Sequence, residues 1–187
     1  FNREAAKKKV AENGRRDPEH EFGTNPCSEI ILRPYQFCNL TEVVIRATDE
    51  AKDLKRKVRL ASQLGTYQST LTDIKYLRKI WRDNTEEERL LGVSLTGIMD
   101  NQLTIEADPK LLKSMREMAV ETNKDLAKKL KIPQSAATTC IKPSGTVSQL
   151  VDSASGIHTR HSDYYIRTVR GDNKDPLTQM MKDQGIP

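Results

Sequence analysis

The sequence predicts an α/β domain, because short apolar runs typical of strands alternate with longer amphipathic runs typical of helices. The strand-like runs lie at residues 30–32, 42–45, 93–98, 137–141 and 165–169. The chain has 187 residues, enough for one domain with a hydrophobic core or for part of a larger one. Its first residues lack the apolar stretch of a secretion signal, and both ends read as internal. We therefore interpret the chain as a fragment of a longer protein.

Three helices are predicted between these runs. Residues 49–64 place apolar side chains on one face, and Gly65 is a plausible stop. Residues 85–88 read Thr-Glu-Glu-Glu, the pattern of a capping box that opens a short helix. Asp108 followed by Pro109 predicts the N-cap and first turn of a long amphipathic helix.

Composition narrows the classes of partner. The net charge is +5, but basic and acidic residues are interspersed as on solvated helix faces, and aromatic residues make up only 5%. We therefore expect no nucleic-acid surface. No apolar run reaches the roughly 18 residues of a membrane helix, so we expect no membrane partner.

Three cysteines, Cys27, Cys38 and Cys140, are too few and too widely spaced for a secreted disulfide scaffold, which favours a cytoplasmic location. Cys27 and Cys38 with His158 and His161 form a conceivable Cys/His cluster. Their spacing is unlike that of a zinc site, however, and we expect no metal. Cys140 lies in an apolar run, where a free cysteine is usually buried and inert.

The stretch NPCSEI places an amide, a thiol and a carboxylate on alternate positions, at Asn25, Cys27 and Glu29. If the stretch is extended, these three groups point to the same side of the chain. A carboxylate beside Cys27 disfavours the thiolate form that a nucleophilic cysteine needs. The combination is better suited to one-electron chemistry, in which a thiyl radical removes a hydrogen atom while the carboxylate acts as a general base.

A second informative stretch runs from Thr139 to Leu150, where a strand-like run leads into Pro-Ser-Gly-Thr. Gly145 permits close approach of the backbone, and free N–H groups at a helix start attract anions. Hydroxyl groups at positions 144, 146 and 148 add possible donors to a phosphate. A plain strand–turn–helix with a Ser/Thr cap explains the same residues, so the pattern alone leaves both interpretations open.

Together these stretches resemble a known family. NPCSEI matches the Asn-x-Cys-x-Glu finger loop of ribonucleotide reductase large subunits, and FCNLTEV, with Cys38, is similar to the segment that carries a redox-active cysteine. KPSGTVSQLVDSASGI resembles the loop that holds the substrate phosphates. LGVSLTGIMDN, HSDYYIRTVR and the short spacing from Cys27 to Cys38 resemble the monomeric, adenosylcobalamin-dependent class.

The resemblance implies part of a ten-stranded α/β barrel with a central catalytic finger loop, with residues 1–187 in one domain and no internal boundary. Cys27 would become the thiyl radical, Glu29 would take a proton from the 3′-hydroxyl, and Asn25 would hold the ribose. Cys38 and a partner cysteine outside the fragment would supply reducing equivalents. The substrate phosphates would be seated by Ser144, Gly145, Thr146, Val147 and Ser148.

The resemblance also implies adenosylcobalamin as cofactor, a ribonucleotide substrate that is a triphosphate in the monomeric class, and thioredoxin or a similar reductant. A deoxynucleotide allosteric effector would bind outside the fragment. Two alternatives remain open. One is a class I large subunit, which takes its radical from a separate metal-containing subunit. The other is a non-catalytic nucleotide-binding module.

Overall fold

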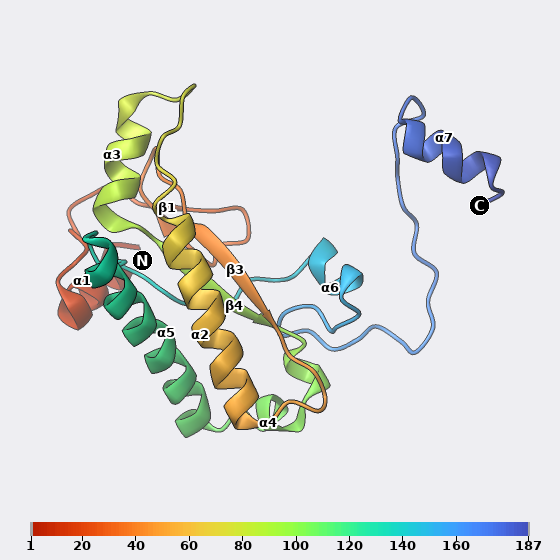
Figure 1. Ribbon diagram of the computed structural model, residues 1–187, viewed down its shortest axis with the longest axis horizontal. Coiled ribbons are helices and arrows are strands. Elements are labelled where there is room, and N and C mark those ends of the chain that lie inside the picture. Colours follow the sequence, from red (N-terminus) through yellow and green to blue (C-terminus); the bar gives the residue numbers. More distant parts are fainter. Residues whose placement is uncertain (1, 187) are drawn as a thin grey trace.

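The computed structural model describes residues 2–186, apart from the side chains of Asn2, Lys9, Ala11, Glu12 and Asn13. At its centre two strands, β3 (Asn39–Val44) and β4 (Leu91–Thr96), pair in parallel. Helix α2 (Ala51–Gln68) packs on both strands, and α5 (Pro109–Leu130) packs alongside α2 (Figure 1). The α/β class is therefore confirmed. The described residues do not close into a barrel.

The hydrophobic core lies between this strand pair and the two helices. Alternate strand residues face the helices, because side chains along a strand alternate between its two faces. The helices contribute residues three and four positions apart, as an amphipathic helix requires. Burying a side chain such as Leu54 stabilises the fold by about 1.5–3 kcal/mol. The buried cluster comprises Val43, Ile45, Leu54, Val58, Ala61, Leu91, Val93, Met115 and Ala119.

The parallel register brings distant parts of the sequence together. Asn39 lies opposite Leu91 and Val44 lies opposite Thr96, while Thr139 forms a parallel bridge to Val93. Three of the predicted strand runs therefore lie side by side in one small parallel arrangement. Parallel neighbours need a long crossover, and helices provide it here.

Gly65 does not end α2, contrary to the prediction from sequence, because the helix continues to Gln68. Gly65 is buried on the face that packs against β4, and a Cβ there would lie 2.8 Å from Cδ2 of Leu91. The glycine is explained by this close approach of helix to strand.

The predicted capping box at residues 85–88 is also wrong. These residues form the last turn of α3 (Lys79–Glu88), which ends at Arg89 in the left-handed conformation with φ 43°. The Thr85 and Glu88 side chains, which would cap a helix start, instead form hydrogen bonds with residues distant in sequence. The Thr85 hydroxyl accepts the N–H of Phe37 at 3.4 Å, and the Glu88 carboxylate is bound by Arg16.

The start of α5 is confirmed. Asp108 accepts the N–H of Lys110 at 3.0 Å, and Pro109 occupies the first turn. Residues 165–169, predicted as a strand, pair with no other described segment and lie exposed in the trailing part of the chain (Figure 1).

The remaining elements, except the 12-residue α1, are short. They are α1 (Asn2–Asn13), β1 (Gly23–Thr24), β2 (Ile31–Leu32), the 3-10 turn η1 (Ile98–Asp100), α4 (Gln102–Ile105), α6 (Thr146–Leu150) and α7 (Pro176–Asp183). No helix within residues 2–186 combines the length and the apolar character needed to cross a membrane.

A buried ion pair anchors residues 16–36 to α3. Arg16 donates to both carboxylate oxygens of Glu88, at 2.9 and 2.7 Å, and the two side chains are 3% and 1% exposed. Gln36 donates to the same carboxylate at 2.6 Å, and Arg16 also donates to the carbonyl of Ile31. The chain before and after residues 25–29 is therefore tied to one buried carboxylate.

We expect Glu88→Ala to lower the free energy of unfolding by about 3–5 kcal/mol, because it leaves the buried Arg16 guanidinium without its counter-charge. Urea unfolding followed by circular dichroism measures the change. Asp83→Ala in the same helix is the control. Asp83 pairs with Lys79 at the surface, so its loss should cost about 1 kcal/mol or less. Equal costs for the two variants would contradict the anchoring role of Glu88.

Candidate active site

The finger-loop residues lie between β1 and β2, which pair as a short antiparallel hairpin. The loop is not extended, so Asn25, Cys27 and Glu29 are not brought to one side by alternation along a strand. The N–H of Ser28 donates to the carbonyl of Asn25 at 2.9 Å, and Ser28 has a left-handed φ of 61°. The Asn25 side chain turns back and accepts the N–H of Ile30 at 3.0 Å. A tight turn, rather than alternation along a strand, therefore sets the positions of Asn25, Cys27 and Glu29.

The hairpin rests on the sheet face opposite the helices. Leu91 and Val93 face the helices, so Gly92 between them faces the other way. A Cβ on Gly92 would lie 3.2 Å from Cδ1 of Ile30 and 3.0 Å from Sγ of Cys140. The absence of a side chain at Gly92 lets the residue that follows Glu29 sit directly on β4.

Glu29 is held by a residue that the sequence interpretation did not assign. Lys142 donates from Nζ to Oε1 of Glu29 at 2.9 Å, and the same Nζ lies 3.9 Å from Sγ of Cys27. The Glu29 side chain is 4% exposed and that of Lys142 is 35% exposed. The second carboxylate oxygen, Oε2, is buried without a hydrogen-bond partner.

The surroundings of Glu29 favour its ionised form. Burial alone would raise the pKa of its carboxyl, but the Lys142 ammonium outweighs burial together with smaller contributions from the N–H of Glu29 and the Asn25 amide, and the pKa falls below its ordinary value. Neither of these two smaller donors forms a hydrogen bond to Oε2. Glu29 also raises the pKa of Lys142, by hydrogen bonding and by its charge, against the smaller effect of burial. A carboxylate and an ammonium therefore stand together beside the thiol of Cys27.

Cys38 and Cys140 pack together at the edge of a second buried cluster that contains Ile30 and Leu90. Burial, with the nearby Cys140 thiol and the Glu29 carboxylate, raises the pKa of Cys38 to about 12. Burial and the charge of Glu29 raise the pKa of Cys140 to about 11. Both are free neutral thiols, whereas Cys27 is free and exposed. Cys140 is half-buried, so the expectation from sequence that it is buried is met only in part.

The Ser/Gly/Thr loop is held by its own hydroxyl groups. Ser144 is buried and its Oγ accepts the N–H of Ser148, while the buried Ser148 hydroxyl donates to the carbonyl of Gly145 at 2.9 Å. Gly145, Thr146 and Val147 are exposed. Two of the five predicted phosphate-binding residues therefore shape the loop, and three present it to solvent.

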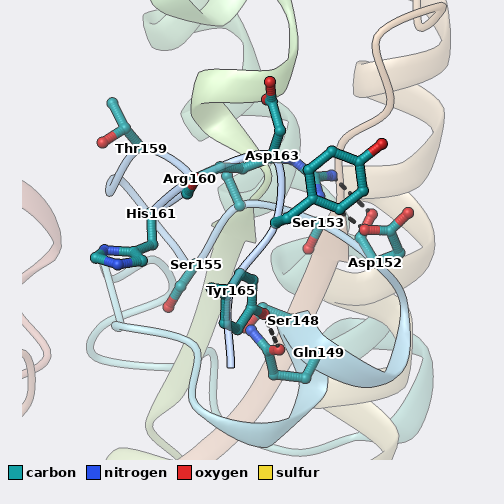
Figure 2. A pocket seen from close by; sticks show the side chains of 13 residues that line it. Ser148, Gln149, Asp152, Ser153, Ser155, Thr159, Arg160, His161, Asp163 and Tyr165 are labelled. Carbon is teal, nitrogen blue, oxygen red and sulfur yellow. Dashed lines mark hydrogen bonds and ion pairs between the residues drawn. The ribbon is translucent and has the colours of Figure 1, made fainter. Parts of the chain in front are cut away.

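The loop leads into a polar cavity of about 680 Å³ (Figure 2). Arg160 donates to Asp100 at 2.9 Å and to Asp152 at 2.7 Å, and Tyr165 donates to Gln149 at 2.6 Å across the cavity lining. His161 stacks edge-on against Tyr165. Among residues 2–186 no three His, Cys, Asp or Glu side chains are grouped so that they could hold a metal ion.

The chain is similar to known proteins in sequence and in fold, although no protein-family model matches it. It is 31% identical to an adenosylcobalamin-dependent ribonucleoside-triphosphate reductase of Lactobacillus gasseri, over 87% of this chain and 25% of that protein. It is 30% identical to the enzyme of the same name from Lactobacillus leichmannii, over 86% of this chain and 25% of that protein. The chain thus spans about a quarter of the length of these curated relatives.

Two solved structures are similar in fold. A crystal structure of a B12-dependent, class II ribonucleotide reductase matches 73% of this chain and 22% of that chain with a TM-score of 0.60 and 25% identity. The alpha subunit of a class Id ribonucleotide reductase from Actinobacillus ureae matches 99% of this chain and 39% of that chain with a TM-score of 0.55. Its 17% identity supports a likeness of fold alone.

We expect iodoacetamide at pH 8 to modify Cys27 well before Cys38 or Cys140. The pKa of Cys38 rises from 9.0 to about 12, so its thiolate is roughly 1000-fold scarcer than that of an unperturbed thiol. Mass spectrometry of peptides after timed alkylation gives the three rates. In denaturant the three rates should converge. Equal rates in the folded chain would contradict the raised pKa and partial burial of Cys38.

Replacing Gly92 by valine should displace the hairpin from β4, because its side chain would occupy space now filled by Leu40, Cys140 and Ile30, whose nearest atoms lie 2.5, 3.0 and 3.2 Å from a Cβ at Gly92. We expect a loss of about 1–3 kcal/mol in unfolding free energy, together with faster alkylation of Cys140. Gly23→Ala is the control, since a Cβ at Gly23 meets no atom within 4 Å. An unchanged Cys140 rate in Gly92→Val would refute the close packing.

Proposed function

We propose that this chain, a relative of adenosylcobalamin-dependent ribonucleoside-triphosphate reductases, is the catalytic segment of such an enzyme. The reaction replaces the 2′-hydroxyl of a ribonucleotide with hydrogen and supplies deoxyribonucleotides for DNA. The observation that carries the proposal is the pair formed by Cys27 and Glu29, an exposed thiol two residues from a carboxylate that its surroundings keep ionised. The names of the relatives favour a triphosphate substrate.

In the proposed reaction Cys27, as a thiyl radical, removes the 3′-hydrogen atom of the ribose. Glu29 accepts the proton of the 3′-hydroxyl, which favours loss of the 2′-hydroxyl as water. Asn25 positions the ribose through its amide, and its fixed place in the turn supports this role. Cys38 remains a neutral thiol until it and a partner cysteine deliver two electrons and two protons and become a disulfide.

The exposed residues of the Ser/Gly/Thr loop are proposed to meet the substrate phosphates. Thr146 offers a hydroxyl, and Gly145 and Val147 offer backbone groups at the surface. Ser144 and Ser148 are proposed to act through the loop shape that their internal hydrogen bonds maintain. All five predicted residues thus keep a part in phosphate binding, in two different ways.

The exposed Cys27 is compatible with a cofactor that must reach its sulfur from outside the hairpin. Adenosylcobalamin, when bound, supplies the radical that removes the hydrogen atom from Cys27 Sγ. Cys27 is thus the residue on which the cofactor would act. The Glu29 side chain is largely shielded from water beside the exposed Cys27.

We further propose that residues 1–187 belong to one ten-stranded α/β barrel domain without an internal boundary, in a monomeric, cytoplasmic enzyme. Thioredoxin or a similar dithiol protein would regenerate the thiols, and a deoxynucleotide effector would bind outside this chain. A class I large subunit would share the fold. The adenosylcobalamin-dependent relatives at about 30% identity favour class II. The thiol–carboxylate pair argues against a purely nucleotide-binding module.

The test uses full-length protein, a ribonucleoside triphosphate and a dithiol. We expect deoxyribonucleotide to form only when adenosylcobalamin is added, and we expect Cys27→Ser to abolish product. Cys140→Ser is the matched cysteine control and should retain activity. Product formed by Cys27→Ser would contradict the radical role of Cys27. Product formed without the cofactor would contradict the class II assignment.

A further inference from the structure

Lys142 lies beside both Cys27 and Glu29 in the candidate site. Its ammonium lies 2.9 Å from Oε1 of Glu29 and 3.9 Å from Sγ of Cys27, so one cation touches both functional groups of the finger loop. Its side chain comes from the segment that leads into the Ser/Gly/Thr loop, 113 residues away from Glu29 in sequence. Lys142 therefore connects the finger loop with the segment that leads into the Ser/Gly/Thr loop.

The position of Lys142 is built into the fold. Its backbone N–H donates to Oγ of Ser94 on β4 at 3.0 Å. Gly156 has a left-handed φ of 55° and packs so closely that a Cβ there would lie 2.9 Å from the carbonyl oxygen of Lys142. The next residue, Pro143, restricts the backbone further. These constraints hold the backbone from which the side chain reaches Glu29.

The two oxygens of Glu29 have different surroundings. Oε1 accepts the Lys142 ammonium, whereas Oε2 is buried without a hydrogen-bond partner. A buried carboxylate oxygen without a partner is costly, and a ligand hydroxyl that donates to it would remove that cost. Oε2 is therefore the oxygen prepared to accept a hydrogen bond.

We propose that Lys142 is a positioning residue of this site, which binds Oε1 of Glu29 and so reserves Oε2 as the acceptor for a ribose hydroxyl. The identity of the hydroxyl rests on the proposed function, whereas the Lys142–Glu29 pair does not. When the hydroxyl transfers its proton, the O–H bond breaks, its electron pair stays on the hydroxyl oxygen, and a new O–H bond forms at Oε2. Lys142 keeps its own protons throughout.

The charge of Lys142 also sets the pH range in which Glu29 can act as a base. The other titratable groups near Glu29 are the thiols of Cys27, Cys38 and Cys140, so Lys142 supplies the one cation that acts directly on the carboxyl among the residues described. Burial raises the pKa of Glu29, and Lys142 makes the largest contribution that lowers it. Because the pKa is lowered in the folded protein, the ion pair persists above this pKa and is lost as the pH falls through it.

The test compares Lys142→Gln with Lys142→Arg in full-length protein. Lys75→Gln, at an exposed lysine between α2 and α3, is the matched control. Infrared difference spectra against Glu29→Gln report protonation of the Glu29 carboxyl without any turnover. We expect the protonation midpoint to move to higher pH in Lys142→Gln, to stay near the unsubstituted value in Lys142→Arg, and to be unchanged in Lys75→Gln. An unmoved midpoint in Lys142→Gln overturns the proposal.

The pH profile of kcat/KM is the second measurement. In Lys142→Gln the acid limb should move to higher pH, with activity falling about tenfold for each pH unit below it, while activity recovers on the alkaline side. A loss that is equal at every pH would indicate a merely structural role and overturn the proposal. If the infrared midpoint moves in Lys142→Gln but the unsubstituted full-length protein forms no deoxyribonucleotide, the role of Lys142 is supported and the proposed function is refuted. The two failures can therefore be told apart.

Discussion

A parallel sheet must be covered on both faces, and the structure depends on how this chain meets that requirement. Helices α2 and α5 cover one face of β3 and β4 through the main hydrophobic core. The β1–β2 hairpin lies on the other face, in contact at Gly92. The candidate site is thus part of the cover of the sheet, and the packing that stabilises the strands also places Glu29.

Each functional group comes from a different part of this arrangement. Cys38 immediately precedes β3, Lys142 follows the bridge that Thr139 makes to β4, and Glu29 comes from the hairpin. Parallel pairing aligns the segments of Cys38 and Lys142, and the contact of Ile30 with Gly92 places the hairpin beside them. The Arg16–Glu88 pair then fixes the hairpin at its base, because it binds chain on both sides of the loop to α3.

The electrostatics of the site follow from partial burial. A fully exposed Glu29 would be ionised without help, and a buried one without a cation would tend to stay protonated. Lys142 resolves this conflict, because it supplies a cation while leaving one carboxylate oxygen available. The same burial that would disfavour the Glu29 anion keeps Cys38 a neutral thiol. One low-polarity region thus holds a carboxylate ionised and a thiol protonated, and the difference lies in which group has a cationic partner.

The sequence by itself determined the α/β class and the start of α5 at Asp108, because these depend on periodicity and capping, and its short motifs singled out Asn25, Cys27 and Glu29 as candidate site residues. It misassigned Gly65 and residues 85–88, whose local patterns suit a helix end and a helix start. Close packing on Leu91 and the buried pair with Arg16 decide those positions instead. Only the tertiary structure decided that NPCSEI forms a turn and that Lys142 meets Glu29. Contacts across 113 residues arise from strand pairing and burial, which no local pattern encodes.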